Sequence, residues 1–492
     1  MSEPLIFEKT KAGAIGVSLP ECDVPERPLE ELIDERYLRK EMAELPEVPE
    51  VEITRHFVRL SKQNVGVDTH FYPLGSCTMK YNPKLNELVA SLSGFANVHP
   101  YQPEEHAQGI LELLYLMQRY LAEIVGMAEV SLQPAAGAHG ELTGIMLIKA
   151  YHEDRKDTKR KKILIPDSAH GTNPASVALC GYKPIELKSD ERGNVDIKAL
   201  RAACDEETAG MMLTIPSTLG LFDENLDEIV EILHENGALL YMDGANMNAI
   251  LGYVRPGDVG VDVMHLNLHK TFSTPHGMGG PGAGPVAVSN RLAPYLPVPV
   301  VKKVGERYSL DYERPKSIGQ VKLFYGNISV IIKAFAYILS LGARGLRRVA
   351  EMSVLNANYI QAILKKFYYL KYERYCMHEC VLSGNWQKKK NDIRTLDIAK
   401  RLLDLGFHPP TVYFPLIVEE AIMIEPTETE TKETLDGFCE AMIRIAQEAE
   451  LNPDLLRNAP QKTPVRRLDE VRASRQPILR YSRTPKTIES QS

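Results

Sequence analysis

The chain has 492 residues, which is enough for two or three packed units around a large hydrophobic core. Its apolar, charged, glycine and proline contents are those of an ordinary globular protein. The net charge of -7 gives no basic field for a nucleic acid, and the sparse aromatic residues are not interleaved with basic runs, so we expect no nucleic-acid partner.

Neither the first residues of the chain nor its apolar runs predict secretion or a membrane span. Residues Met1 to Pro4 lead into acidic residues and lack the basic and apolar regions of a signal peptide. The longest apolar run, Val330 to Ala343, is interrupted by Lys333 and is too short to cross a bilayer. We therefore expect a cytoplasmic protein with no membrane contact.

The seven cysteines are an odd number scattered along the chain, which is not typical of a disulfide framework. Cys376 and Cys380 flank His378, but no second ligand pair with zinc-like spacing accompanies them. This pattern favours two buried thiols on a helical face over a metal site.

Residues 1–105 are rich in proline and glutamate and have few long periodic runs, which predicts an extended arm around a larger body. Within it, Asp68 to Pro83 places small polar side chains, a thiol and a lysine between apolar residues. This stretch is either an irregular turn or the lining of a site, and its residues alone favour neither interpretation.

From Glu104 onward, apolar residues recur at helical spacing, which predicts a helix that ends at Gly126. The small residues of Gln133 to Gly140 then open a second helical run. Backbone N–H groups at such a helix start point outward at the positive end of the helix dipole, so Gly137 and Ala138 could bind a phosphate. A tight turn is the alternative.

Short apolar runs next alternate with helical stretches, which predicts an α/β domain with a mostly parallel sheet over residues 106–335. Ligands of such sheets bind beyond the carboxyl ends of the strands. The expected strands are Ile163–Ile165, Ile185–Leu187, Met211–Ile215, Ala238–Met242, Val261–Leu266 and Val286–Val288, and the expected helices between them include Ile197–Cys204 and Leu226–Glu235.

Four of these strands are followed by polar, titratable or small residues, and parallel strand ends would gather them at one rim of the sheet. Each stretch alone is an ordinary loop, whereas the four together predict an active site. The stretches are Asp167 to Ser176, Ser217 to Gly220, Asp243 to Asn248, and His269 with Lys270.

The rim residues suit pyridoxal phosphate, which needs a lysine for a Schiff base, an acid at the pyridine nitrogen, a phosphate cradle and a flat group on the ring. Lys270 lies at the end of an apolar strand, in a partly desolvated position that favours a reactive amine. Asp243 supplies the acid, the loop at Gly137 the cradle, and His170 the aromatic ring.

After Gly326 the helical period dominates, and a mixed segment follows, with a helix expected at Ile393–Leu405 and a strand at Val412–Val418. These elements predict a smaller α/β domain over residues 336–492. The expected organisation is therefore an arm (1–105), a large cofactor-binding domain (106–335) and a small C-terminal domain (336–492).

Several long stretches resemble the P-protein family of the glycine cleavage system, glycine dehydrogenase (decarboxylating), and within it the lysine-bearing subunit of the split form. The resemblance covers nearly the whole chain from about residue 70, and its lysine motif is specific. The matching stretches are Gly75 to Lys80, Ser168 to Ser176, Tyr241 to Asn248, His265 to Gly284, Ile424 to Glu430, and Arg466 to Asp469.

The resemblance implies a fold-type-I aminotransferase-like architecture, with a mostly parallel seven-stranded sheet between helices and a smaller C-terminal α/β domain. It also implies pyridoxal-phosphate-dependent decarboxylation of glycine, with transfer of the aminomethyl group to the lipoyl arm of H-protein. The implied catalytic residues are Lys270, His170 and Asp243. The implied cofactor contacts are Gly137, Ala138 and His269 at the phosphate, Thr218 at the ring hydroxyl, and Ala245.

The resemblance further implies a second subunit that supplies the other half of the enzyme, in a heterodimer or an α2β2 assembly. Two positions depart from the family pattern: Met278 interrupts the glycine run, and Ala136 and His139 replace residues of the phosphate loop. Two alternatives stay open, namely another fold-type-I amino-acid decarboxylase that needs no carrier, and a non-catalytic scaffold subunit.

Overall fold

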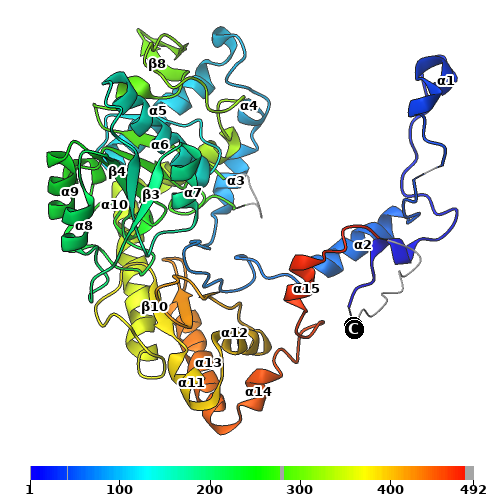
Figure 1. The fold of residues 1–492 in the computed structure, drawn as a ribbon. Helices are drawn as coiled ribbons and strands as arrows, with labels where there is room; N and C mark the ends of the chain where they lie inside the picture. Colours follow the sequence, from blue (N-terminus) through cyan, green and yellow to red (C-terminus); the bar gives the residue numbers. More distant parts are fainter. Residues whose placement is uncertain (1, 42, 277–281, 482–492) are drawn as a thin grey trace. The chain divides into compact units, whose positions relative to one another are not determined.

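The computed structural model describes residues 2–41, 43–276 and 282–481 (Figure 1). The described chain divides into two compact units, one formed by residues up to Gly66 together with those from Pro460, and one from Val67 to Ala459. The expected boundaries near residues 105 and 335 do not coincide with this division. The three-part organisation stays a prediction.

The first unit joins the beginning of the described chain to its end. Glu3 accepts hydrogen bonds from Arg59, at 2.8 Å and 3.0 Å, and its Oε1 lies 3.0 Å from His56 Nδ1. The ring of Phe7 stacks on that of Tyr481, with centroids 4.6 Å apart. Its elements are the 3-10 helices η1 (Ile6–Lys9) and η2 (Glu35–Tyr37) and the helices α1 (Leu29–Leu32), α2 (Glu50–Ser61) and α15 (Glu470–Arg475).

The second unit is built around a seven-stranded sheet of order β1-β7-β6-β5-β4-β2-β3. The pairs from β6 through β5, β4 and β2 to β3 are parallel, and only β7 runs against its neighbours in this sheet. All six expected strands are present. The bounds are β1 Glu129–Ser131, β2 Lys162–Pro166, β3 Lys183–Leu187, β4 Thr208–Thr214, β5 Leu239–Gly244, β6 Val263–Leu266 and β7 Val286–Val288.

Helices cover both faces of this sheet because the buried strand residues alternate between two cores. Ile163 and Tyr241 pack with α6 on one face, whereas Leu164 and Leu240 pack with α5, α9 and α10 on the other. The helices are α3 Lys84–Ala90, α4 Ser93–Ala96, α5 Gln108–Val125, α6 Gly137–Asp154, α7 Thr172–Leu179, α8 Ile197–Ala203, α9 Leu226–Glu235 and α10 Ile328–Leu364, with 3-10 turns η3 Glu104–His106, η4 Met247–Ala249, η5 Pro256–Val259 and η6 Ala293–Tyr295.

Helix α10 is, among the described helices, the one whose length and composition would allow it to cross a membrane, a property that core helices of soluble proteins share. It bends at Gly342, whose backbone (φ 59°, ψ -176°) is not helical. Its buried side chains, including Ile331 and Val349, pack into the larger core, and it contacts α3, α5 and α13.

A smaller antiparallel sheet follows α10, with β12 (Ala421–Ile424) between β10 (Cys380–Ser383) and β11 (Thr411–Val412). The expected strand at Val412–Val418 is wrong beyond Val412, because Tyr413 has a positive φ of 60° and Pro415 cannot donate to a ladder. The remaining elements are the hairpin of β8 (Val300–Val304) and β9 (Arg307–Asp311), and helices α11 Asn385–Asn391, α12 Thr395–Asp404, α13 Lys432–Leu451 and α14 Asp454–Arg457.

Cys376 and Cys380 are both buried, as expected, but they do not share a helical face. Cys376 lies in the connection between α10 and β10, and Cys380 is the first residue of β10. The spacing of four residues between the two cysteines favoured a helix. Cys380 instead begins strand β10, whose partner, β12, comes from a later part of the chain.

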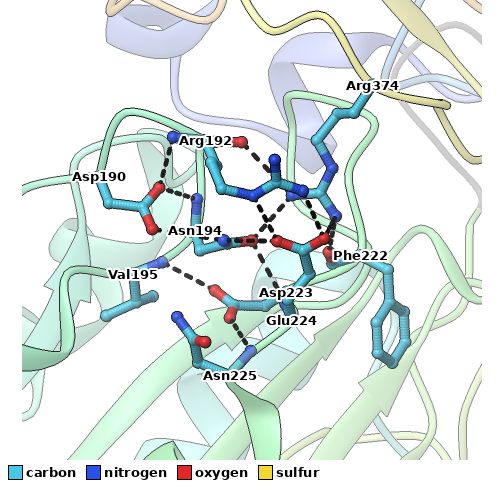
Figure 2. Close-up of polar contacts among 9 residues, drawn as sticks. All are labelled: Asp190, Arg192, Asn194, Val195, Phe222, Asp223, Glu224, Asn225 and Arg374. Carbon is cyan, nitrogen blue, oxygen red and sulfur yellow. Dashed lines mark hydrogen bonds and ion pairs between the residues drawn. The ribbon is translucent and has the colours of Figure 1, made fainter.

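The connection that carries Cys376 is fixed to the large sheet by Arg374 (Figure 2). Its guanidinium donates to Asn194 Oδ1 at 2.9 Å and to the Phe222 carbonyl at 2.8 Å. Glu224 belongs to the same set of contacts, because its carboxylate accepts hydrogen bonds from Arg192 Nε at 2.8 Å and from Arg192 Nη2 at 2.7 Å. These contacts tie the segment before β10 to the loops that follow β3 and β4.

Candidate active site

A cavity of about 220 Å³ opens at the carboxyl ends of β2, β4, β5 and β6, and it collects all eight residues that the sequence predicts for the site. The ends of these parallel strands share one edge of the sheet, as the alternation of strands and helices indicated. The predicted residues that line it are Gly137, Ala138, His170, Thr218, Asp243, Ala245, His269 and Lys270; Ser76, Glu141, Thr172, Thr214, Asn246, His265 and Asn267 line it as well.

Lys270 follows β6, and its Nζ donates a hydrogen bond to the Ser76 carbonyl at 2.7 Å. The next residue, Thr271, is fixed by the buried Lys80, whose Nζ donates to the Thr271 carbonyl at 2.9 Å and to Glu428 at 2.7 Å. Two segments that carry the family resemblance, around residues 75–80 and 424–430, therefore meet directly beside Lys270.

Asp243 lies at the end of β5 and is only 3% exposed. Its Oδ1 accepts the Ala245 N–H at 2.9 Å and lies 3.4 Å from His265 Nε2, while its Oδ2 accepts Asn173 Nδ2 at 3.3 Å. Burial alone raises the pKa of Asp243, but His265, the Ala245 N–H and the charge of Lys270 together outweigh burial and hold this pKa below its ordinary value. Asp243 is therefore ionised at neutral pH.

Glu141 is a second carboxyl group in the same cavity, and it was not among the predicted site residues. It receives Thr172 Oγ1 at 2.9 Å and Asn173 Nδ2 at 3.3 Å, so Asn173 bridges Glu141 and Asp243. Burial, together with the nearby charge of Asp243, raises the pKa of Glu141 to about 7. The sequence signal was a charged residue between Gly140 and an otherwise apolar helical run.

His265 was also missed as a site residue, although a histidine inside an apolar strand was a usable signal. It is buried in β6, and its Nδ1 lies 2.6 Å from the Tyr241 hydroxyl. Burial lowers the pKa of His265. The ring therefore links Tyr241 to Asp243 as a polar side chain of the sheet interior.

The first residues of α6 also line the cavity. Ala136 precedes the helix and offers no capping side chain, which leaves the first N–H groups of α6 without a cap bond. A Cβ atom at Gly137 would lie 2.6 Å from Asn267 Oδ1, so the absence of a side chain keeps this space open. His269 Nδ1 accepts the Ala283 N–H at 3.3 Å, which leaves its Nε2 to carry the ring hydrogen.

The remaining predicted residues line the cavity with their polar atoms partly engaged. His170 is exposed, and its Nδ1 lies 2.9 Å from Thr172 Oγ1. The Thr218 hydroxyl donates its hydrogen to the Ser168 carbonyl, so a lone pair is left to meet a ligand. The roles assigned to these residues stay predictions. Met278, the departure in the glycine run, lies outside the described residues.

Family models match most of the chain. The model for the glycine cleavage system P-protein matches residues 27–306, and the model for the C-terminal domain of glycine dehydrogenase matches residues 349–461. The chain is 61% identical over 479 residues to a probable glycine dehydrogenase (decarboxylating) subunit 2 from Caldanaerobacter subterraneus subsp. tengcongensis, with 97% of this chain and 99% of the relative covered. A protein of the same name from Bacillus velezensis is 59% identical, with 98% of each chain covered.

Solved structures with the same fold include a glycine decarboxylase (P-protein) of the glycine cleavage system in inhibitor-bound form. It has a TM-score of 0.72 at 22% identity and covers 85% of this chain and 95% of that chain. Lactobacillus brevis glutamate decarboxylase follows, with a TM-score of 0.63 at 14% identity and coverage of 85% and 97%. These likenesses confirm the expected fold-type-I architecture, and the family models and full-length relatives place the chain in the glycine cleavage system P-protein family.

Proposed function

We propose that this chain is the cofactor-bearing subunit of a glycine dehydrogenase (decarboxylating), which removes the carboxyl group of glycine and passes the aminomethyl group to the lipoyl arm of H-protein. The observation that carries the proposal is the single cavity that Lys270, Asp243 and the uncapped start of α6 all line. Membership of the P-protein family gives this geometry its substrate.

The residues of the cavity fit pyridoxal phosphate. Buried Asn246 Oδ1 lines the cavity and has no hydrogen-bond partner among the described residues, and the missing side chain of Gly137 leaves space against the first turn of α6. When bound, the cofactor supplies a protonated pyridine ring that accepts the electron pair left by the departing carboxylate.

The charges of the cavity suit that chemistry. Asp243 is ionised and buried, so it can hold a proton on the ring nitrogen far better than a solvated carboxylate could. Lys270 provides the amine for covalent attachment. The N–H groups of Gly137 and Ala138, with the Nε2–H of His269, bind the phosphate group.

With the cofactor bound, His170 would stack on the face of the ring, Thr218 would meet the ring hydroxyl through its free lone pair, and Ala245 would lie on the nitrogen side. Each of these side chains or backbone groups lines the same cavity. The enzyme acts together with a subunit 1, in a heterodimer or an α2β2 assembly, and we place it in the cytoplasm.

The first test is borohydride reduction of the cofactor-loaded chain, followed by peptide mapping. We expect the reduced cofactor on Lys270 and none in K270A. K149A is the control, because Lys149 Nζ donates to the Cys180 carbonyl and does not line the cavity. Trapping on another lysine contradicts the site, and no trapping in the presence of subunit 1 favours a scaffold role.

The second test is the exchange of glycine's carboxyl carbon with labelled bicarbonate, measured with subunit 1 and with or without lipoylated H-protein. We expect full exchange only with H-protein, because its lipoyl arm is the acceptor of the aminomethyl group. If methylamine is released from glycine as fast without H-protein as with it, this result contradicts the proposal and favours a carrier-independent decarboxylase.

A further inference from the structure

The turn that receives Lys270 is held in a conformation that its residues adopt rarely. Ser76 and Thr78 both have left-handed backbones, with φ of 64° and 48°, although neither is glycine. Such conformations persist where the surroundings fix them, and they concentrate at functional sites. The cause is therefore to be found in the groups that bind the backbone of this turn.

Two buried glutamates bind the backbone N–H groups of these two residues. Glu379 Oε2 accepts the Ser76 N–H at 2.7 Å, and Glu425 Oε2 accepts the Thr78 N–H at 2.8 Å. Glu425 Oε1 also accepts the Thr78 hydroxyl at 2.6 Å. Both carboxyl groups have no exposed surface, and neither lines the cavity.

Each of the two glutamates lies at the end of a strand of the small sheet. Glu425 follows β12 directly, and the Glu425 N–H in turn donates to the Pro73 carbonyl at 3.2 Å. Glu379 precedes β10 and ends the segment that Arg374 fixes at its other end (Figure 2). Between these ends, the Met377 N–H donates to the Gly220 carbonyl at 2.7 Å, two residues beyond the cavity residue Thr218.

The Glu379 carboxyl acts as a hydrogen-bond acceptor at this turn. Burial, together with the charge of Glu425, raises the pKa of Glu379 well above its ordinary value. Its neighbour His378 supplies no compensating charge, because burial lowers the pKa of that ring to about 3. An amide side chain at position 379 therefore preserves the acceptor, whereas a thioether of the same length removes it.

We propose that Glu379 and Glu425 are positioning residues for the cofactor lysine: they fix the left-handed turn at Ser76–Thr78, and the Ser76 carbonyl of this turn fixes the Lys270 amine at 2.7 Å. The lysine would then approach the cofactor from a fixed position, and the Ser76 carbonyl would accept a hydrogen bond from the Lys270 amine whenever that amine is not attached to the cofactor. This inference rests on the proposed function, because it assigns Lys270 as the cofactor lysine.

The test measures how fast the cofactor-free chain attaches pyridoxal phosphate to Lys270, by borohydride quenching at successive times and mass mapping of the lysine peptide. The dependence on cofactor concentration separates binding from attachment. We expect E379M to lower the attachment rate constant by about tenfold, since small misplacements of reacting groups have effects of this size or larger. E379Q should stay within about twofold of the wild type, since it keeps the acceptor.

Two further variants decide between positioning and general damage. Glycine adopts a positive φ without steric cost, so the double variant E379M/S76G should regain most of the lost rate. E420M is the matched control, because buried Glu420 accepts the Thr395 N–H at 2.8 Å in the same sheet region, away from the turn; we expect no change in the rate. Thermal unfolding of each variant checks folding, and T78V, which loses only the hydroxyl bond to Glu425, replaces E379M if that variant does not fold.

The outcomes separate this inference from the proposed function. Attachment at Lys270 with an unchanged rate in E379M, or in T78V as its substitute, overturns the positioning role and leaves the function intact. A slow E379M that S76G does not accelerate also overturns it, because the turn is then not the route of the effect. Attachment to a lysine other than Lys270 overturns the proposed site itself.

Discussion

Two buried carboxyl pairs flank the cavity, and they differ in what binds them. Asp243 and Glu141, on the side proposed for the ring nitrogen, line the cavity and share the amide of Asn173. Glu379 and Glu425, at the lysine side, lie outside the lining and accept the backbone N–H groups of a turn. The first pair is therefore placed to act on a ligand through charge, and the second through the position of the backbone.

This difference shows that burial of an acid does not by itself indicate a catalytic charge. Burial raises the pKa of Glu379 well above its ordinary value, whereas His265, the Ala245 N–H and the charge of Lys270 hold the pKa of the buried Asp243 below its ordinary value. The number and kind of hydrogen-bond donors around each carboxyl group decide which behaviour it shows.

The largest effect on activity is expected from D243N, which keeps the shape of the side chain and removes its charge. We expect kcat for glycine–bicarbonate exchange to fall by on the order of 10² to 10³, a size typical of losing one preorganised electrostatic contact. D262N is the control, because Asp262 is also buried and lies 2.8 Å from a histidine, His234, but does not line the cavity. A kcat within threefold of the wild type would contradict the role of charge at the nitrogen side.

K80M tests the ion pair that holds the backbone beside the lysine. Removal of the Lys80 amine leaves Glu428 buried without its partner, so we expect the free energy of unfolding to fall by about 3 to 5 kcal/mol. The exposed pair of Lys84 and Asp68 gives a matched comparison, and K84M should cost less than about 1 kcal/mol. Urea unfolding followed by circular dichroism measures both, and equal losses in the two variants would argue against a special role of burial.

E141Q tests the pH dependence of the nitrogen-side pair. The pKa of Glu141 is raised to about 7, so between pH 4.5 and 7 the folded chain keeps a proton that the unfolded chain has lost. Stability should therefore fall as pH rises through this window, by up to about 3 kcal/mol for this group, and E141Q should lack that part of the slope. E153Q, at an exposed position of the same helix, should keep the wild-type slope. Parallel pH profiles for wild type and E141Q would exclude the raised pKa.

G137A is expected to have the smallest effect. The added Cβ would lie 2.6 Å from Asn267 Oδ1, so the asparagine must shift. We expect this shift to cost about 1 kcal/mol, which is near the low end of the costs of overpacking substitutions. Cofactor affinity, measured by absorbance titration, should weaken about tenfold, which corresponds to about 1.4 kcal/mol. G109A, where a Cβ meets nothing within 4 Å, should leave the affinity unchanged. An unchanged affinity in G137A would remove Gly137 from the phosphate site.

The positions of Lys270 and Asp243 could be predicted because each follows an apolar run, and the ends of parallel strands meet at one edge. The start of α6 was also readable from its small residues. Glu379 and Glu425 could not be selected this way, since their partners lie 303 and 347 positions away and no local period reports such a contact. The same reason applies to β10 and β12, whose pairing joins segments about forty residues apart.

The meeting of Phe7 with Tyr481, and of Glu3 with α2, has a consequence for the order in which this protein is made. Synthesis proceeds from the amino end, and compact units fold as their residues emerge. Residues 67–459 hold all the described strands and can pack before the last segment is synthesised, whereas Phe7 lacks the ring of Tyr481 until residue 481 appears. The unit that contains the first described residues is therefore completed last. A nascent chain stalled near residue 460 would contain the residues of the cavity, and Phe7 would still lack its stacking partner Tyr481.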